Sequence, residues 1–248
     1  MACNSTGGGG GANMGANVQT DVIIPQNSEW PAGDVDGYKN MTQYYMANQM
    51  FGSDEDVPGS TISPAFYPDG AVKDWLTETP LGDLKGVRHY TGSSYYEINE
   101  SLRNNDPSIL KGADKKAIIG TTEALKNGVV PEPFIAHRGS SAHLITGTAS
   151  CTLQDIQERI GEVVADKAFV STSAVKGSGF GGQVLYHIKT PAGKGIGAYV
   201  DPISMNKGGA ESEFLFQRGS KFRIVGGYED SSGMLHCNLE YVGNTVGT

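Results

Sequence analysis

Two glutamates stand one residue apart at the head of an apolar segment, in the stretch ESEFLFQRGSKFRI of residues 211–224. If this stretch is an extended strand, Glu211 and Glu213 point to the same face, roughly 6.5 to 7 Å apart. Two carboxylates held that way raise each other's proton affinity unless cations or hydrogen-bond donors intervene. Such a pair is typical of charge-stabilising and acid–base sites, but E-x-E triplets also open ordinary strands. The triplet alone therefore leaves a solvated strand edge and an active site both open.

Two further segments carry polar groups at the end of an apolar run. FVSTS would place Ser171 and Ser173 on one face of a strand, although ordinary half-buried strands also alternate Ser and Thr. In FIAHRGS, Arg138 can present its planar fork to a phosphate, and Gly139 allows a ligand to approach the backbone. A surface arginine at a strand end is the simpler interpretation. His137 alternates away from Arg138, and we expect it to be structural.

Several other chemistries lack their sequence signatures. The glycine-rich stretch GSGFGG of residues 177–182 fits neither the dinucleotide-binding G-x-G-x-x-G unit nor the phosphate-binding Walker loop. No H-E-x-x-H, C-x-x-C or G-x-S-x-G motif occurs, and the five histidines show no ligand spacing. Cys3, Cys151 and Cys237 are too few and too scattered for a disulfide framework or a zinc site. We therefore expect no metal.

The segments that would position these residues are helical first and strand-like later. Apolar residues at helical spacing predict helices over 38–51, 94–103, 114–128 and 152–164, the last opening with a Thr152–Asp155 capping pair. Short apolar segments, several of which alternate apolar and polar residues, predict strands over 132–140, 167–173, 183–190, 195–201, 213–219, 221–228 and 234–242. Helices followed by short strands, without a regular strand–helix alternation, favour an α+β fold over a doubly wound α/β fold.

Length and composition predict one domain with an N-terminal extension. The chain has 248 residues, and we expect a disordered Gly-rich tail over 1–20, an extension over 21–84 and a core over 85–248. A net charge of −8 and a pI near 5.1 disfavour nucleic acid as a partner. No run approaches the roughly 18 to 20 apolar residues of a membrane span, and the N-terminus lacks the apolar core of a secretory signal.

Taken together, these segments resemble a known enzyme family. An arginine on one strand, S-T-S on a second and E-x-E at the head of a third occur in the order that is typical of the arginine–serine–glutamate class of mono-ADP-ribosyltransferases. The stretch YTGSSYYEINESLR of residues 90–103 is similar to the NAD-side helix of that family, which commonly reads Y-T-x-x-x-Y-x-x-I-N. The resemblance covers roughly residues 85 to 245, and clostridial-type toxins and Rho-modifying exoenzymes belong to the same class. It implies two packed, mainly antiparallel β-sheets with flanking N-terminal helices.

The resemblance also implies a mechanism. These enzymes break the bond between nicotinamide and ribose in NAD, their co-substrate, and transfer ADP-ribose to an acceptor. Glu213 would stabilise the positive ribose and bind its 2′-hydroxyl, and Ser171 would hold Glu213 in place. Arg138 would bind the NAD phosphates, and Glu211 would orient the acceptor and help to remove its proton. The other implied residues of the NAD site are Asn99, Arg103, Gly139, Thr172, Ser173, Phe180 and Gln183.

The acceptor that the resemblance implies is arginine. In this family glutamate at the position of Glu211 goes with arginine acceptors, whereas glutamine marks the asparagine-modifying Rho group, and a carboxylate can pair with a guanidinium. The expected partner is a protein that presents an arginine, with actin as one candidate. Two departures stand out. Relatives often have Phe-x-x-Arg after S-T-S, whereas the corresponding four residues here begin with Phe180 and have Gln183 in place of the arginine. The target loop 202–210 also lacks the aromatic residue of many members.

Three alternatives stay open at this point. The same site with water as acceptor would make the protein an NAD glycohydrolase. Paired carboxylates could also serve a glycoside hydrolase, although sugar clefts are usually rich in aromatics and this chain has two Trp. A non-catalytic binding or virion protein could retain the fold. We expect a monomer that is secreted or delivered into a host cell cytoplasm, as a toxin, an effector or a phage enzyme that modifies its host.

Overall fold

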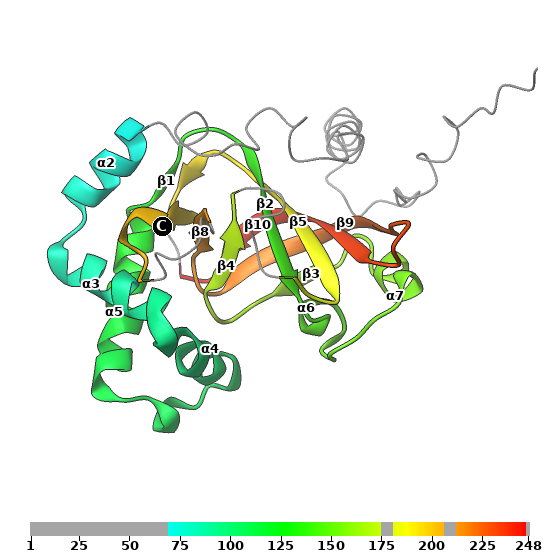
Figure 1. Ribbon diagram of the computed structural model, residues 1–248, viewed down its shortest axis with the longest axis horizontal. Helices are drawn as coiled ribbons and strands as arrows, with labels where there is room; N and C mark the ends of the chain where they lie inside the picture. Colours follow the sequence, from blue (N-terminus) through cyan, green and yellow to red (C-terminus); the bar gives the residue numbers. More distant parts are fainter. Residues whose placement is uncertain (1–68, 175–180, 206–211, 247–248) are drawn as a thin grey trace, which may run out of the picture.

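The computed structural model describes residues 69–174, 181–205 and 212–246. The expected Gly-rich tail and the expected helix over 38–51 lie outside these residues. Helices gather on one side of a β-sheet, and two short helices lie at its opposite end (Figure 1). The expected α+β class with a mainly antiparallel sheet is confirmed.

The helical flank forms the first part of the described chain. Its elements are α2 (Asp69–Glu78), α3 (Leu81–His89), the π-helical turn η3 (Tyr90–Ser94), α4 (Tyr95–Asn104), the 3₁₀ turn η4 (Pro107–Ile109) and α5 (Gly112–Lys126). The chain kinks at Gly92, whose backbone is not helical, so that α4 leaves in a new direction from α3. The α4 helix ends on Asn105 in the left-handed conformation, before Asp106-Pro107. The predicted helices over 94–103 and 114–128 therefore correspond to α4 and α5.

The flank packs on the sheet through its own apolar cluster. Trp75, Tyr90, Ile98 and Leu125 from the helices are buried together with strand residues such as Leu215. The Trp75 indole N–H donates to the carbonyl of Ala124 at 2.9 Å, which fastens α2 to α5. The cluster holds η3 and α4 against the sheet.

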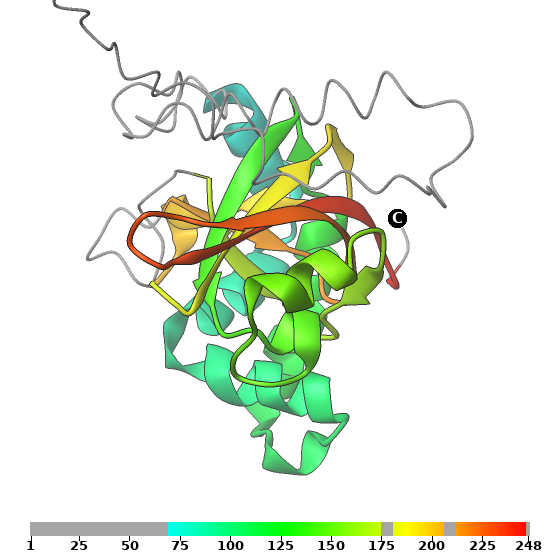
Figure 2. The same cartoon turned by 90° about the vertical axis from the view of Figure 1, so that its right-hand side faces the viewer.

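Ten strands follow in the described residues, and eight of them form one sheet. The small two-stranded sheet pairs β1 (Val129–Val130) with β6 (Gly193–Lys194). The large sheet has the order β3-β9-β10-β5-β2-β4-β8-β7. Its strands are β2 (Phe134–Ser140), β3 (Val163–Ala165), β4 (Val170–Ser173), β5 (Val184–Thr190), β7 (Gly197–Tyr199), β8 (Glu213–Phe216), β9 (Ser220–Glu229) and β10 (Leu235–Asn244). Figure 2 shows β9 and β10 crossing the other strands of this sheet.

The large sheet consists of two parts joined at one point. All neighbouring pairs are antiparallel except β5 with β10. Among the residues that the structure describes, β2 and β4 pair only through His137 and Ser173, whereas β2 pairs with β5 over seven residues. This single pair links a five-stranded part to the part formed by β4, β8 and β7. The two packed sheets expected from the family resemblance are thus hydrogen-bonded into one at that link.

The helix predicted over 152–164 is wrong beyond its first turns. The Thr152–Asp155 capping pair is present, and α7 runs over Leu153–Glu158. Gly161 then adopts φ 93, a left-handed conformation that ends the helix, and Val163–Ala165 pairs with β9 as β3. The β-branched valines favour that strand. The short helix α6 (His143–Thr146) precedes it.

Two further expectations meet the structure only in part. The expected boundary between residues 84 and 85 falls within α3 (Leu81–His89), and the division of the chain into extension and core stays a prediction. Of the three cysteines, Cys151 and Cys237 lie in the described residues, and both are free thiols.

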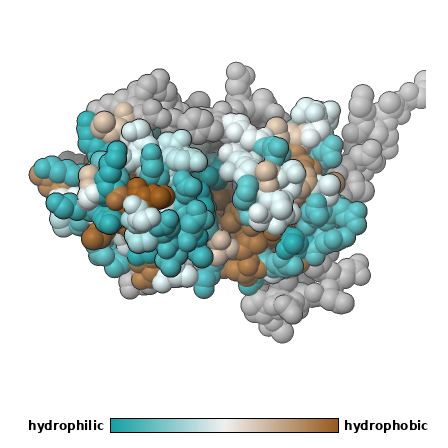
Figure 3. Space-filling view, turned by 90° about the horizontal axis from the view of Figure 1, so that it is seen from below, coloured by the Kyte–Doolittle hydropathy of each residue, from teal (hydrophilic) through white to brown (hydrophobic). Residues whose placement is uncertain are grey.

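None of the helices that the structure describes has the length and apolar character needed to cross a membrane. From below, the surface is mostly hydrophilic with small hydrophobic patches (Figure 3).

Candidate active site

The carboxylate of Glu213 lies at the start of β8 and accepts a hydrogen bond from the neighbouring strand. Ser171 on β4 donates from Oγ to Glu213 Oε1 at 2.7 Å. The register of the strands explains the contact, because Ser173 lies opposite Glu213 and Ser171 shares its face two residues away. Glu213 is 6% exposed. A carboxylate so deeply buried requires hydrogen-bond partners, and Ser171 supplies one.

The chain enters β8 through a left-handed residue. Ser212 has φ 51, and β8 begins at Glu213, so the extended strand expected to run through residues 211 to 213 is interrupted. The backbone here is held on both sides: Ala174 N–H donates to the Ser212 carbonyl, and Glu213 N–H donates to Asp201 Oδ1 at 3.3 Å. The same-face geometry expected for two carboxylates on one strand therefore does not apply. Glu211 itself lies outside the described residues.

Arg138 reaches from β2 to the strand that carries the serines. Its guanidinium Nη1 donates to the carbonyl oxygen of Ser171 at 2.5 Å. Desolvation by burial lowers the pKa of Arg138, but a guanidinium stays charged at physiological pH. Gly139 follows it on β2, opposite Leu185. The positive charge of Arg138 therefore lies next to the hydroxyl that contacts Glu213.

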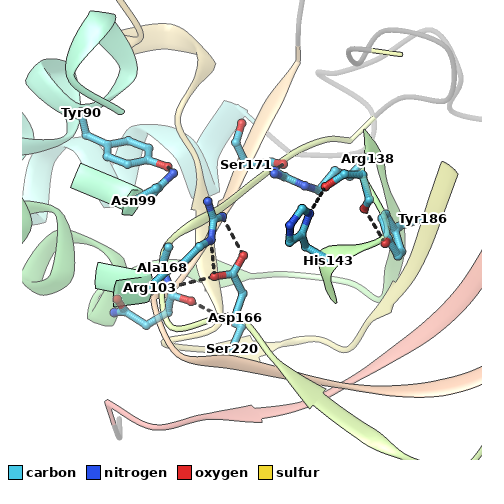
Figure 4. Close-up of polar contacts among 12 residues, drawn as sticks. Tyr90, Asn99, Arg103, Arg138, His143, Asp166, Ala168, Ser171, Tyr186 and Ser220 are labelled. Atoms are coloured by element: carbon cyan, nitrogen blue, oxygen red, sulfur yellow. Dashed lines mark hydrogen bonds and ion pairs between the residues drawn. The ribbon is translucent and has the colours of Figure 1, made fainter. Parts of the chain in front are cut away.

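Tyr90 and Asn99 approach the same region from the helical flank. Asn99 Nδ2 donates to the Tyr90 hydroxyl at 2.9 Å, and both residues are buried. Burial raises the pKa of Tyr90 far above its usual range, and the negative charge of Glu213 adds to that effect. The Tyr90 hydroxyl therefore keeps its proton. The Asn99 Oδ1 atom is buried and has no hydrogen-bond partner in the described residues. Figure 4 shows both side chains facing the strand of Ser171.

Arg103 of α4 is one partner of an ion pair and is therefore not an isolated cation. Its Nε and Nη2 donate to the two oxygens of Asp166 at 3.0 and 2.8 Å (Figure 4). Asp166 also accepts from Ala168 N–H at 2.9 Å, just before β4. This bidentate pair ties the helical flank to the strand that carries Ser171. Sequence reasoning missed Asp166, and only its position shortly before FVSTS could have suggested it.

Of the remaining residues of the expected site, two are buried between β4 and β8, one is exposed, and two lie outside the described residues. Thr172 is buried and donates to the Phe214 carbonyl at 2.7 Å, which makes it a fastening between β4 and β8. Ser173 is 2% exposed and pairs with Glu213. Gln183 is exposed just before β5. Phe180, like Glu211, lies outside the described residues. Tyr90 belongs to the stretch that resembles the NAD-side helix, but its hydroxyl was not among the expected site atoms.

Together these elements bring a carboxylate and a guanidinium into one site. Such a site suits a substrate that develops positive charge and also carries an anionic group. Glu213 can stabilise positive charge, whereas the guanidinium of Arg138 can neutralise phosphate. No cluster of His, Cys, Asp and Glu suited to a metal ion occurs among the residues that the structure places. The chemistry of these donors fits a ligand that carries a positive ring and a diphosphate.

Comparison with known proteins identifies the family. A protein of Mycobacterium avium (strain 104) named "Putative NAD(+)--arginine ADP-ribosyltransferase Mav" is 32% identical over 147 residues, which is 58% of this chain and 16% of that relative. Plx2a, an ADP-ribosyltransferase toxin from Paenibacillus larvae, superposes with a TM-score of 0.61 at 21% identity over 71% of this chain and 94% of its own. C3stau2 from S. aureus, solved with NAD, superposes with a TM-score of 0.56 at 15% identity, also over 71% of this chain and 94% of its own. The sequence profile of the ADP-ribosyltransferase exoenzymes matches residues 67–241. The chain belongs to the ADP-ribosyltransferase exoenzyme family.

Proposed function

We propose that this protein transfers ADP-ribose from NAD to an arginine side chain of a target protein and releases nicotinamide. The observation that carries the proposal is the 2.7 Å hydrogen bond from Ser171 to the buried carboxylate of Glu213, with Arg138 on the carbonyl of the same serine. The name of the M. avium relative, of which this chain spans about one sixth, supports NAD and arginine as the reactants. The toxin names among the structural neighbours support delivery of the enzyme into a target cell.

Glu213 supplies the charge that the reaction needs. When the bond to nicotinamide breaks, the ribose carbon becomes positive, and a carboxylate already in place stabilises that charge without reorganising. The hydrogen bond from Ser171 uses one of the roughly four acceptor positions of the carboxylate, so Glu213 can also accept from the ribose hydroxyl when NAD binds. Because Glu213 is nearly inaccessible to water in the described structure, its charge is weakly screened.

The binding of NAD rests on residues from both sides of the site. Arg138 uses one N–H on the Ser171 carbonyl, and its other donors can bind phosphate oxygens. On the helical side, Asn99 Oδ1 is a buried acceptor that lacks a partner, and the Tyr90 hydroxyl is a donor that keeps its proton. A buried acceptor without a partner is costly, and a donor group of NAD would relieve that cost. Thr172 and Ser173 would hold β4 in register with β8.

Glu211 is proposed to select the acceptor. An arginine side chain must lose a proton as its nitrogen joins the ribose, and a carboxylate can both pair with the guanidinium and accept that proton. The left-handed Ser212 turns the chain immediately before Glu213, so the two glutamates need not act on the same group. Glu213 would serve the ribose, and Glu211 would serve the acceptor.

Incubation with NAD and agmatine, a small guanidine, tests this assignment. We expect the wild type to form ADP-ribosyl-agmatine and nicotinamide in equal amounts. Glu211→Gln should lose the conjugate while it retains part of the nicotinamide release. Glu162→Gln serves as a matched control, because this glutamate is exposed in an ion pair with Arg159. Free ADP-ribose with no conjugate from the wild type would show an NAD glycohydrolase instead, and equal loss of both activities in Glu211→Gln would contradict the division of roles.

A further inference from the structure

Three histidines that lie far apart in the sequence form a continuous chain of hydrogen bonds across the sheet. His137 Nδ1 lies 2.9 Å from His187 Nδ1, and His187 Nε2 lies 2.8 Å from His236 Nδ1. His236 Nε2 lies 3.2 Å from Asp230 Oδ2 in the turn between β9 and β10. The chain thus crosses β2, β5 and β10 and ends on a carboxylate.

The strand register creates this arrangement. His137 and His187 are directly paired on β2 and β5, and His236 lies two residues before Asn238, the partner of His187 on β10. All three rings therefore project from one face of the sheet. The ring of Tyr228 stacks on His236 with centroids 4.2 Å apart, and His236 stacks on His187 at 5.1 Å. His187 and His236 are 7% and 6% exposed, so packing fixes both rings in place.

The charge of Asp230 determines the direction of every bond in the chain. The Ser232 hydroxyl together with the Met234 and Ser232 N–H groups holds the pKa of Asp230 well below its usual range. An ionised carboxylate only accepts, so His236 Nε2 must donate to it. The Nδ1 atom of a neutral His236 then accepts from His187 Nε2. By the same rule, His187 Nδ1 accepts from His137 Nδ1.

The chain can hold one additional proton and not two. A single added proton on any of the three rings leaves each junction with one donor and one acceptor, provided that the neighbouring bonds reverse direction. Two added protons would force a pair of N–H groups to face each other at a junction of 2.8 or 2.9 Å. The three imidazoles therefore behave as one titrating unit.

One end of this chain lies at the link between the two parts of the sheet. In the described part of the chain, His137 makes the one pair between β2 and β4, with Ser173, and Ser173 lies opposite Glu213. Arg138 is the next residue of β2. We propose that Asp230, His236, His187 and His137 form a one-proton chain that positions β2, and with it Arg138, beside β4. His137 and His187 are thus positioning residues for NAD binding, which rests on the function proposed above for Arg138.

The other charged groups at positions facing the chain come from each strand that packs on it. On β9, Tyr228 lies opposite His236 and Arg223 lies opposite Glu240, which is also paired in register with Lys189 of β5. Arg138 adjoins the chain on β2, and Glu213 lies across β4. Lys189 and Arg223 are positive and Glu240 is negative, so these fixed charges do not cancel, and Asp230, which accepts directly from His236, sets the polarity of the chain.

NMR of the histidine ring nitrogens in the whole protein tests the chain directly and without NAD. At neutral pH we expect the Nε2–H tautomer for His187 and His236 and the Nδ1–H tautomer for His137. On acidification the three rings should titrate together with uptake of one proton. An Nδ1–H tautomer at His236, or three separate steps near the value of about 6.5 for free imidazoles, would overturn the proposal.

Kinetics of NAD cleavage test the positioning role. His187→Phe keeps a flat ring but removes both junctions, and we expect about a tenfold higher KM for NAD with kcat within about twofold. His187→Gln keeps one donor and one acceptor and should bring KM back towards the wild type. Equal KM values in the wild type and both folded variants would refute the role. If Glu213→Gln left NAD cleavage intact, the proposed function would fail, whereas the tautomers would still report on the chain.

Discussion

Replacement of Ser171 by alanine isolates the contact on which the site depends. The change removes the hydroxyl that donates to Glu213 Oε1 at 2.7 Å and leaves the backbone carbonyl that accepts from Arg138. A hydrogen bond to a charged group contributes about 1.5 to 3 kcal/mol. Because Ser171 is only half-buried, water can replace part of this bond, and we take the lower half of that range, about 1.5 to 2 kcal/mol.

If the bond holds Glu213 in the position that the transition state requires, most of this energy appears in the rate. Each 1.36 kcal/mol corresponds to a factor of ten, so kcat/KM for NAD cleavage should fall about 10- to 30-fold. Nicotinamide release at limiting and saturating NAD measures the loss. Urea unfolding of the same variant should show a loss of no more than about 2 kcal/mol, so that the rate is measured on folded protein.

Thr172→Val is the matched control on the next residue. Its hydroxyl is buried and donates to the Phe214 carbonyl at 2.7 Å, so the change removes one buried hydrogen bond between β4 and β8. We expect this variant to lose about 1 to 2 kcal/mol of stability and to keep kcat/KM within about threefold. A folded Ser171→Ala protein with wild-type kcat/KM, or an equal catalytic loss in Thr172→Val, would refute the role given to Ser171.

Two further predictions concern the helical flank. Asp166→Ala breaks the bidentate pair with Arg103, whose side chain is 44% exposed. We expect the free energy of unfolding in urea to fall by about 1 kcal/mol and the KM for NAD to rise. An unchanged KM would show that this ion pair does not contribute to NAD binding. Asp114 accepts from His89 at 2.8 Å and from Lys111 N–H at 2.9 Å, and the bond from His89 leads the causes that lower its pKa. A lowered pKa stabilises the fold above the unfolded value of about 3.9 and loses that effect as the pH falls through the folded value. Asp114→Asn should therefore cost about 1 kcal/mol at pH 7 and little at pH 3, and an equal difference at both pH values would contradict this sign.

The main elements of the site could be predicted because each lies in a segment with a clear apolar run or a clear period. The strands around Arg138, Ser171 and Glu213 are short apolar runs that end in or begin with polar residues, and the helix that carries Asn99 repeats at helical spacing. Local pattern also gave the capping pair of α7. It could not show where α7 ends, since a left-handed Gly161 and the pairing of β3 with β9 depend on the tertiary fold.

Contacts between distant segments escaped the sequence for a physical reason. The partners Arg103 and Asp166 are 63 residues apart, and the histidines of the chain are separated by about 50 residues at each step. Histidine spacing along the sequence carries no sign of this chain, because strand register alone brings the rings together. The left-handed Ser212 was missed for the opposite reason: its neighbours have the composition of a strand, and serine is an unusual residue at positive φ.

The release of nicotinamide from NAD by the wild type and by Glu213→Gln tests the central claim most directly. Glutamine keeps the shape and an acceptor for the Ser171 hydroxyl, but it removes the charge that would stabilise the ribose. We predict cleavage by the wild type and a fall in kcat of at least about 100-fold in the variant, with the urea midpoint retained. Nicotinamide release by Glu213→Gln within a few fold of the wild type would contradict the account.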